Sequence, residues 1–512
     1  MQTLDKRFME RVSLILPKEE RALFFENCTR PLPKVVRIAP LKEAPSPIIA
    51  TTLSEVGEMK IQNIPEGWIL TPTAIPGAYF IDREEKSLPL GKTMEHFCGK
   101  IYIQSLSSML PVLVLNPMPG DKVLDMCAAP GSKSTFMAEK MENSGTLVCN
   151  ELSSSRSKKL VANINRLGVL NSVVTQNNGF TMSTYFDQEF DKILLDAPCS
   201  SEGFGRKDSK FFSQMWDEKK IFEAAKLQRG LICSAFEMLR PGGEMVYSTC
   251  TTAPEENELV VEHLLTQYRE AVEIVSVDEY SEVLKGKIPY TEGTREWSEQ
   301  NIRSSVSSNS IRIWPHKYNK EWDSECFYLI KIRKVRALRD RKVVKSFSGL
   351  ENKKMRGKTL ELVKKNQKAE YLVRWEKDFG IPRKAFTGKE LVRKEEGSLW
   401  LMTRDCFNFV QKNRYQRVGV EAVDKHGNFT SEFAIHFGRL ATKQILALTV
   451  EEKDRWLAGY DLVVNQPIGN SDQKLKGNEN ILFVHFEGFC LGWGKVMNES
   501  KLKNKLNRDL VF

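Results

Sequence analysis

Two cysteines and one aspartate stand at the ends of short apolar runs in this sequence. Asp196 and Cys199 follow the run 193–195, and Cys250 ends a run that begins at residue 244. Both runs are predicted strands, and the carboxyl ends of neighbouring strands in an open α/β sheet line one crevice. We therefore expect Asp196, Cys199 and Cys250 to converge. A thiol attacks only as the thiolate, which basic groups in such a cleft would favour.

A carboxyl group beside two thiols suits chemistry at carbon 5 of a pyrimidine. That carbon is a poor nucleophile until a thiolate adds at carbon 6, which makes carbon 5 enamine-like and able to take a methyl group from a sulfonium. The acid would hydrogen-bond the ring N3 and the exocyclic amine as charge develops. One thiol would attack and the other would assist release, and the spacing leaves open which does which. The alternative, two buried packing residues, is disfavoured because both thiols stand at strand ends.

The candidate cofactor loop follows the predicted strand 123–126. It consists of Cys127, Ala128, Ala129, Pro130, Gly131, Ser132 and Lys133. Small residues let a ligand approach the backbone, and the start of the following helix offers free N–H groups. The loop lacks the first glycine of a Walker motif and is not a G-x-G-x-x-G turn either. It therefore predicts a cofactor that needs no phosphate site.

The second predicted strand of this region ends at Glu151. An acid at this position can accept hydrogen bonds from both ribose hydroxyls of a nucleoside cofactor. Glu151 can also act as the acid at the start of the helix that follows Ser153, and the two roles are compatible. Together with the loop, Glu151 predicts an adenosine-type cofactor.

Strands and helices are predicted to alternate through the middle of the chain. The apolar runs 123–126, 146–149, 173–175 and 193–195 predict strands, and the amphipathic stretches 134–141, 154–167 and 221–239 predict helices. This alternation is typical of an α/β fold with a parallel, doubly wound sheet. A chain of 512 residues is long enough for about three domains.

Charge and cysteine usage narrow the class of protein. The formal net charge is +10, and residues 331–358 hold twelve Lys and Arg against two acids, which is typical of a surface that binds nucleic acid or, alternatively, of a solvated linker. None of the ten cysteines forms a C-x-x-C pair, so we expect no metal site and a reducing compartment. Without a signal segment or a membrane-length apolar run, we expect a cytoplasmic protein that does not bind a membrane.

Four motifs carry a resemblance to a known family. Residues 124–135 (LDMCAAPGSKST), 149–158 (CNELSSSRSK), 194–203 (LLDAPCSSEG) and 247–258 (YSTCTTAPEENE) resemble, in order and spacing, the Sun-type RNA cytosine-5 methyltransferases. The resemblance implies a Rossmann-like class I methyltransferase sheet with an α+β N-terminal domain. It implies S-adenosylmethionine bound by the 127–133 loop, Glu151, Asn178 and Asp196. It also implies that Cys250 is the nucleophile and that Cys199 assists release.

Two positions depart from the family pattern, and one nearby segment follows it. Asn178 stands where the family usually has Asp, and its amide oxygen can still accept a hydrogen bond from an adenine amino group. Ser201 stands where the family commonly has Gly, with an effect that the sequence does not predict. The segment Arg206-Lys207-Asp208 follows as in relatives, and we expect it to touch RNA phosphate.

The C-terminal part resembles a branch of the family. Residues 456–462, 491–495 and 506–510 are similar to the PUA-like extension of the bacterial enzymes that methylate small-subunit ribosomal RNA. We therefore expect an N-terminal RNA-binding or support domain (1–110), a methyltransferase domain (111–335), a basic linker (336–360) and a C-terminal RNA-binding region with a PUA-like domain (361–512). We expect a monomer.

The resemblance predicts methylation of cytosine carbon 5 in RNA, with 16S ribosomal RNA as the expected substrate. The target base must leave its stack to reach the thiols. A transfer RNA substrate is the second hypothesis. The third is a ribosome-assembly factor that binds RNA without catalysis, against which the intact cysteine pair argues. A purine N-methyltransferase is weaker still, because Asp196-Ala197-Pro198-Cys199 lacks an aromatic residue to stack a purine.

Overall fold

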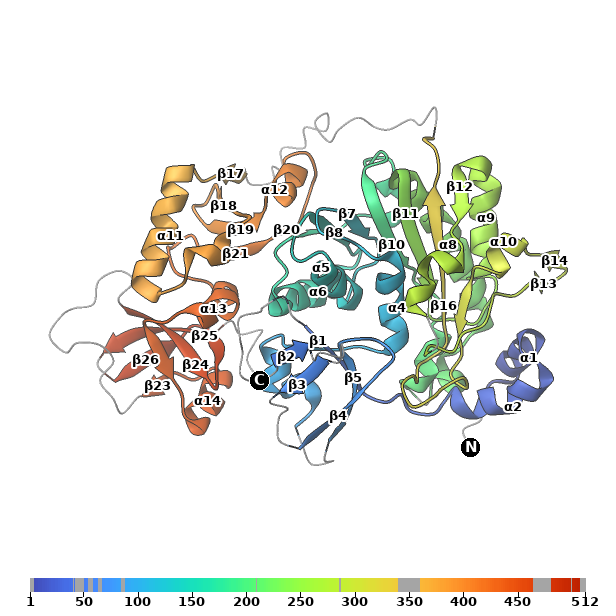
Figure 1. The fold of residues 1–512 in the computed structure, drawn as a ribbon, viewed down its shortest axis with the longest axis horizontal. Helices are drawn as coiled ribbons and strands as arrows, with labels where there is room; N and C mark the ends of the chain where they lie inside the picture. The colour runs from blue at the N-terminus through green and yellow to red at the C-terminus, as the bar shows by residue number, and fades with distance from the viewer. Residues whose placement is uncertain are drawn as a thin grey trace.

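The described residues fold around a central nine-stranded sheet, with a four-stranded sheet from the N-terminal region and a four-stranded and a five-stranded sheet from the C-terminal region. The computed structural model describes residues 4–39, 41, 50–53, 59–62, 67–83, 88–208, 210–284, 287–338, 360–463, 480–498 and 500–506. Figure 1 shows the N-terminal sheet in blue below the central sheet and the C-terminal part in orange and red beside it. Most of the predicted basic segment 336–360, and residues 507–510 of the predicted tail motif, lie outside the described residues.

The central sheet has the predicted parallel core. Its strand order is β12-β16-β11-β10-β7-β8-β9-β20, and β15 also pairs with β16. The strands are β7 (Lys122–Asp125), β8 (Thr146–Asn150), β9 (Ser172–Thr175), β10 (Phe190–Asp196), β11 (Leu239–Thr249), β12 (Val272–Ile274), β15 (Ile311–Ile313), β16 (Phe327–Lys334) and β20 (Arg417–Val418). The strands from β9 to β11 are parallel, whereas β12, β15, β16 and β20 pair antiparallel at the two sides. The predicted strands are confirmed.

Helices cover both faces of the central sheet. One face carries α4 (Leu106–Leu115), α5 (Ser132–Lys140) and α6 (Ser154–Leu167), and the other carries α7 (Gly179–Met182), α8 (Glu218–Met238) and α9 (Glu258–Tyr268). Helix α6 begins where the Ser153 hydroxyl accepts from Arg156 N, and it ends at Gly168, which has a left-handed φ of 84°. These boundaries match the predicted helices 134–141, 154–167 and 221–239 to within a few residues.

The N-terminal sheet is docked on helix α5 by a buried arginine. The sheet has the order β4 (Trp68–Pro72), β5 (Ala78–Arg83), β1 (Val35–Ile38) and β6 (Ile101–Ile103), with the hairpin β2 (Ala50–Leu53) and β3 (Met59–Gln62) separate from it. Arg37 of β1 is 2% exposed. Its guanidinium pairs with Glu139, donates to Thr135 Oγ1 at 3.2 Å and lies 4.6 Å from the Phe136 ring centroid. The helices α1 (Lys6–Ile15) and α2 (Lys18–Asn27) pack separately, in a cluster with residues 211–216, Ile221 at the start of α8, and Trp314.

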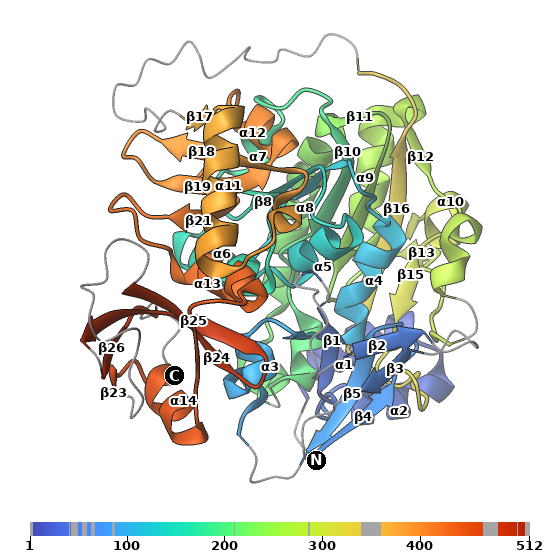
Figure 2. The ribbon, with the colours of Figure 1, turned by 60° about the vertical axis from the view of Figure 1, so that its left-hand side comes forward.

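The first half of the C-terminal region adds a strand to the central sheet. The strands β17 (Leu360–Leu362), β18 (Lys389–Lys394), β19 (Leu399–Thr403) and β21 (Val420–Val423) form one sheet, with α11 (Lys365–Phe379), α12 (Arg404–Val410) and α13 (Ser431–Phe437) around it. From this region β20 pairs with β9, and Phe409 of α12 stacks on Phe186 at 5.9 Å between ring centroids. Figure 2 shows this part lying along the edge of the central sheet.

The second half of the C-terminal region forms a sheet of its own. Its strands are β22 (Ile445–Ala447), β24 (Ile481–Phe486), β25 (Phe489–Asn498), β26 (Lys501–Asn504) and β23 (Leu462–Val463), with α14 (Val450–Leu457) beside them. Its core also includes Phe97 and Cys98 from α3 (Met94–Phe97) and the residue that follows it. The part of the chain that the structure describes contains no helix both long and apolar enough to cross a bilayer.

Candidate active site

The two cysteines meet at the carboxyl ends of β10 and β11. These strands are parallel neighbours in which Asp196 pairs with Ser248, so the residues that follow them emerge together. The Cys199 Sγ and Cys250 Sγ atoms lie 3.3 Å apart. The Ser248 hydroxyl donates to Asp196 Oδ1 at 2.7 Å. The structure thus brings Asp196, Cys199 and Cys250 into one place.

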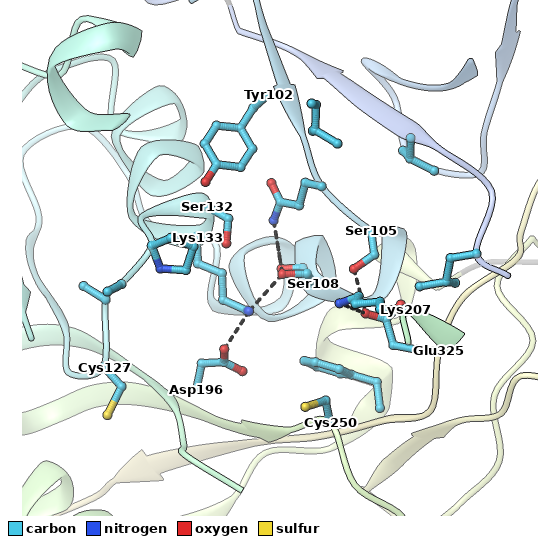
Figure 3. A pocket seen from close by; sticks show the side chains of 18 of the residues that line it. Tyr102, Ser105, Ser108, Cys127, Ser132, Lys133, Asp196, Lys207, Cys250 and Glu325 are labelled. Carbon is cyan, nitrogen blue, oxygen red and sulfur yellow. Dashed lines mark hydrogen bonds and ion pairs between the residues drawn. The ribbon is translucent and has the colours of Figure 1, made fainter. Parts of the chain in front are cut away.

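Lys133 is the cationic partner of Asp196. Its ammonium donates to Asp196 Oδ2 at 2.7 Å and to Ser108 Oγ at 2.9 Å, as Figure 3 shows. Lys133 stands in the first turn of α5 but is only 8% exposed, so it is not the solvated residue that its position in the helix would allow. The pair fixes the orientation of the Asp196 carboxylate.

Two cavities meet at this group of residues. The first, here called the Glu151 cavity, has a volume of about 570 Å³ and is lined by Glu151, Asn178 and Cys199 among others. The second, the Lys207 cavity, has a volume of about 480 Å³ and is lined by Lys133, Lys207 and Glu325 among others. Cys127, Ala129, Asp196, Ala197 and Cys250 line both. A group bound in one cavity can therefore face a group bound in the other across Cys250.

The Glu151 cavity offers the donors and acceptors that an adenosine group needs. Glu151 Oε1 accepts from Ser153 N at 2.8 Å, and Glu151 Oε2 lies 3.4 Å from the Arg156 guanidinium. Each carboxylate oxygen accepts more than one hydrogen bond, so capacity remains for ribose hydroxyls. The side chains of Phe180, Leu227 and Leu231 supply apolar surface for a base. The chemistry of this lining therefore fits the predicted cofactor.

Asn178 lines the same cavity while it caps a short helix. Its Oδ1 accepts from Phe180 N at 3.1 Å at the start of α7. The following Gly179 lies under Leu231 and Met126, where an added Cβ would come within 2.5 Å of a Leu231 methyl group. The pair Asn178-Gly179 therefore holds the end of β9 close to α8, with the amide at the cavity.

The residues of the 127–133 loop are divided between the two cavities. Cys127 and Ala129 line both, whereas Ala128, Pro130, Ser132 and Lys133 line only the Lys207 cavity. Gly131 lines neither: it precedes α5 with a left-handed φ of 104°, and an added Cβ would lie 3.1 Å from Leu160 Cδ1. Gly131 therefore shapes the turn, Cys127 and Ala129 stand where the cavities meet, and the other four residues belong to the wall of the Lys207 cavity alone.

The Lys207 cavity contains an ion pair between Lys207, whose side chain is 46% exposed, and Glu325, a buried acid that the sequence did not single out. The Lys207 ammonium donates to Glu325 Oε1 at 3.0 Å. Ser105 Oγ donates to the same oxygen at 2.8 Å, and Ser324 Oγ donates to Oε2 at 3.0 Å. Burial opposes the charge on Glu325, but the Lys207 ammonium and these hydrogen bonds hold its pKa at about 2. Glu325 is therefore a fixed carboxylate, and Figure 3 shows it with Lys207 beside Cys250.

The two thiols have opposite electrostatic settings. The hydrogen bond from Cys199 lowers the pKa of Cys250, and the Lys207 ammonium lowers it further, against burial and the nearby carboxylates. The same hydrogen bond raises the pKa of Cys199 well above its ordinary value, and burial and the Glu256 carboxyl raise it as well. These directions favour a thiolate on Cys250 over a thiolate on Cys199.

The structure explains the position of Ser201 and tests the expected role of Arg206, both in the segment that follows Cys199. Ser201 has a left-handed φ of 63°, which L-residues adopt at a cost of about 1 kcal/mol and Gly adopts freely, so glycine suits this position. The expectation that Arg206 touches RNA phosphate is wrong. Arg206 is 3% exposed, and its guanidinium donates to Asp323 and to the carbonyl groups of Arg30, Pro31 and Ser324.

Ser108 and Glu325 are site residues that the sequence did not single out, and Lys207, which was expected to touch RNA phosphate, lines the same cavity as both of them. Lys207 follows the motif 194–203 closely, and Ser108 precedes the first strand of the central sheet, so both lay near recognised segments. Glu325 stands in a segment before β16 with no motif of its own. Its role depends on the antiparallel pairing of β16 with β11, which brings it to Cys250.

Comparison with known proteins identifies the family. A family model described as 16S rRNA methyltransferase RsmB/F matches residues 112–333, and one described as methyltransferase RsmF PUA domain matches residues 443–512. The chain is 33% identical to ribosomal RNA small subunit methyltransferase F of Vibrio campbellii, over 99% of this chain and 98% of that protein. It is 34% identical to the Klebsiella pneumoniae protein of that name, over 95% of this chain and 92% of the other.

One solved structure is similar as well. The crystal structure of PH0851 has 27% sequence identity and a TM-score of 0.52, and the similarity covers 65% of this chain and 66% of that chain. The predicted Sun-type resemblance, the class I methyltransferase fold and the PUA-like domain at the C-terminus are confirmed. S-adenosylmethionine is the cofactor of these enzymes. This chain belongs to the RsmB/F family of 16S rRNA methyltransferases.

Proposed function

We propose that this protein methylates carbon 5 of a cytosine in small-subunit ribosomal RNA through a covalent adduct with Cys250. The observation that carries the proposal is the pair of sulfur atoms 3.3 Å apart where two cavities meet beside Asp196. One cavity suits an adenosine group and the other is large enough for a nucleobase. The opposite pKa directions of the two thiols support Cys250 as the attacking group.

Cytosine would enter the Lys207 cavity as a flipped base. The Cys250 thiolate forms a bond to carbon 6, and the electron pair of the C5–C6 double bond moves to carbon 5 and into the ring toward N3. Asp196 accepts a hydrogen bond from the exocyclic amine, and its partner Lys133 stabilises the charge that develops at N3. Carbon 5 is then the nucleophile that takes the methyl group, which S-adenosylmethionine supplies from its sulfonium.

Release of the methylated base requires a base that removes the carbon-5 proton. Cys199 can supply it once Cys250 has formed the adduct. The largest cause of the raised pKa of Cys199 is its hydrogen bond with Cys250. Once Cys250 is bonded to carbon 6 its sulfur no longer carries the negative charge, so the Cys199 pKa falls and its proton can leave to solvent. The Cys199 thiolate then removes the carbon-5 proton, the C5–C6 double bond re-forms, and the Cys250 thiolate is expelled.

Two substitutions test this assignment on a denaturing gel. Cys199→Ala should leave protein covalently attached to RNA, because the adduct forms and its release is impaired. Cys250→Ala should abolish both the adduct and methylation. Cys233→Ala, a partly buried cysteine of α8 that lines neither cavity, is the matched control and should keep both. A Cys250→Ala protein that still forms the adduct would reverse the assignment.

The substrate is tested separately from the chemistry. Labelled methyl transfer to small-subunit ribosomal RNA and to transfer RNA, followed by bisulfite mapping, distinguishes the two RNA classes. Activity on transfer RNA alone would overturn the ribosomal substrate. Absence of transfer to either RNA would favour an assembly factor that binds RNA without catalysis.

A further inference from the structure

The thiol pair by itself does not determine which sulfur carries the negative charge. Cys199 and Cys250 are chemically identical, lie 3.3 Å apart and can each donate to the other. A shared proton in such a pair goes to the sulfur whose surroundings disfavour charge. The surroundings of the two sulfurs must therefore differ for one of them to be the nucleophile.

A cation lies on the Cys250 side of the pair. Lys207 and Cys250 line the same cavity, which Cys199 does not line. Lys207 follows the turn Glu202–Arg206, and Glu325 holds its ammonium at 3.0 Å. The Glu325 side chain is 3% exposed, and two serine hydroxyls hold it. Glu325 therefore anchors the ammonium at the wall of the cavity that Cys250 also lines.

A carboxyl group lies on the Cys199 side of the pair. Glu256 Oε2 accepts from Ser200 N and from Gln228 Nε2, both at 2.9 Å. Gln228 Nε2 also donates to Pro198 O, so the backbone around Cys199 is tied to this acid. Glu256 disfavours charge on Cys199. The remaining charges that face Cys250 are the Asp196 carboxylate, which Lys133 pairs, and Glu325 itself.

We infer that Lys207 is a positioning residue that keeps the negative charge of the thiol pair on Cys250, and that Glu325 holds the Lys207 ammonium in the place from which it does so. The inference rests on the proposed function, because it explains how one thiol is chosen as nucleophile. It assigns this role to an ion pair in which the carboxylate is buried and the lysine side chain is 46% exposed.

The test measures alkylation of Cys250 by iodoacetamide as a function of pH in the full-length protein, without RNA or cofactor. Peptide mass spectrometry reports the labelling of Cys250 and Cys199 separately. Lys207→Gln should raise the pH midpoint of Cys250 labelling by about 1 unit, since an adjacent cation shifts a thiol by that order. The ratio of Cys250 to Cys199 labelling should fall. Lys207→Arg should restore both toward the wild-type values.

Controls separate this effect from loss of structure. Lys210→Gln removes an exposed lysine three residues away and should leave the midpoint unchanged. If Lys207→Gln fails to fold because Glu325 is left unpaired, the double variant Lys207→Gln/Glu325→Gln removes both charges. It should shift the midpoint in the same direction by a smaller amount.

A second measurement connects the charge to the reaction. In the Cys199→Ala background, Lys207→Gln should slow adduct formation on RNA about tenfold at pH 7, which is the effect of one pKa unit, and much less at pH 9. A purely structural role would slow adduct formation equally at both pH values.

An unchanged midpoint of Cys250 labelling in folded Lys207→Gln would overturn the inference. Because labelling needs no RNA, a shifted midpoint without any RNA adduct would instead reject the proposed function.

Discussion

The Glu151 cavity and the Lys207 cavity differ in where their walls come from. Every residue that lines the Glu151 cavity stands between Met126 and Cys250, within the predicted methyltransferase domain. The Lys207 cavity also takes residues 32–35 and 102–105 from the N-terminal segment and Glu325 and Phe327 from the far end of the central sheet. In the proposed function, cofactor binding is therefore a property of one folding unit, whereas base binding depends on how the N-terminal sheet is docked.

Breaking the docking should have the largest effect. Arg37→Met leaves Glu139 buried without its partner, which costs about 3 to 5 kcal/mol when one member of a buried pair is removed. We expect a lower thermal midpoint and loss of methyl transfer to RNA. Cofactor affinity, measured by calorimetry below the unfolding transition, should stay within about threefold of wild type because the Glu151 cavity contains no N-terminal residue.

The double variant Arg37→Met/Glu139→Met is the matched control for charge. Replacing a buried ion pair by apolar residues is often close to neutral, so this variant should recover most of the lost stability. A large loss of cofactor affinity in either variant, while the fold is intact, would contradict the division between the two cavities.

The buried acid Glu256, which accepts a hydrogen bond from Ser200 N next to Cys199, predicts a pH effect. Burial raises the pKa of Glu256 from its ordinary 4.5 to about 7. The native protein then holds a proton that the unfolded chain loses from about pH 4.5 upward, so Glu256 makes stability fall between these two pH values. Glu256→Gln, which resembles the protonated acid, should stabilise the protein at pH 8 by on the order of 3 kcal/mol and little at pH 4. Thermal midpoints across this range measure it, and a constant difference between the two proteins would refute the raised pKa.

Replacing Glu151, the proposed acceptor for the ribose hydroxyls, should affect the Glu151 cavity and leave the Lys207 cavity unchanged. Glu151→Gln keeps the shape of the side chain but removes its charge and one acceptor, and hydrogen bonds to charged groups contribute about 1.5 to 3 kcal/mol. Cofactor affinity should therefore fall about tenfold to a hundredfold. Iodoacetamide labelling of Cys250 in the Lys207 cavity should keep its pH midpoint. A shifted midpoint would show that the two cavities are not separate electrostatically.

The smallest expected effect lies at the outer wall of the Glu151 cavity. Gln416 precedes β20, accepts from Ser157 Oγ at 3.0 Å and donates to Gln176, and Gln176 in turn donates to Leu152 O at 2.9 Å beside Glu151. Gln416→Ala removes hydrogen bonds of about 1 kcal/mol, so cofactor affinity should fall by less than about fivefold. Titration calorimetry can resolve this change. No change at all would mean that the C-terminal region does not contribute to the cofactor wall.

The sequence predicted the Glu151 cavity better than the Lys207 cavity for a physical reason. Glu151, Asn178 and Asp196 each follow an apolar run, and parallel pairing of those runs alone brings them to one edge. Lys207 and Glu325 meet only because an antiparallel strand packs beside β11, and Glu325 is one acid among 66 Asp and Glu residues with no distinctive neighbours. The convergence of Cys199 and Cys250 was predictable, because both stand at strand ends. The different charged groups around the two thiols were not, because these groups come from segments that only the folded chain brings together.

The C-terminal region likewise contains strands that their own residues predict and one strand that forms only by pairing with a remote segment. The apolar runs that became β19 and β24 are visible in the sequence, and both are strands in the structure. The two-residue strand β20 has no periodicity to detect, since two residues are too few to alternate. Its pairing with β9 depends on the shape of both surfaces. The predicted domain boundaries at residues 110, 335 and 360 remain proposals.

The pairing of β20 with β9 has a consequence for synthesis on the ribosome. The parallel core from β7 to β11 is translated early, but the outer side of β9 stays open until Val418 has been made. An uncovered strand edge attracts other chains, so the nascent protein must be protected at β9 for much of its translation. Premature termination before β20 would release a methyltransferase unit in which the outer edge of β9 is unpaired. Such fragments should aggregate.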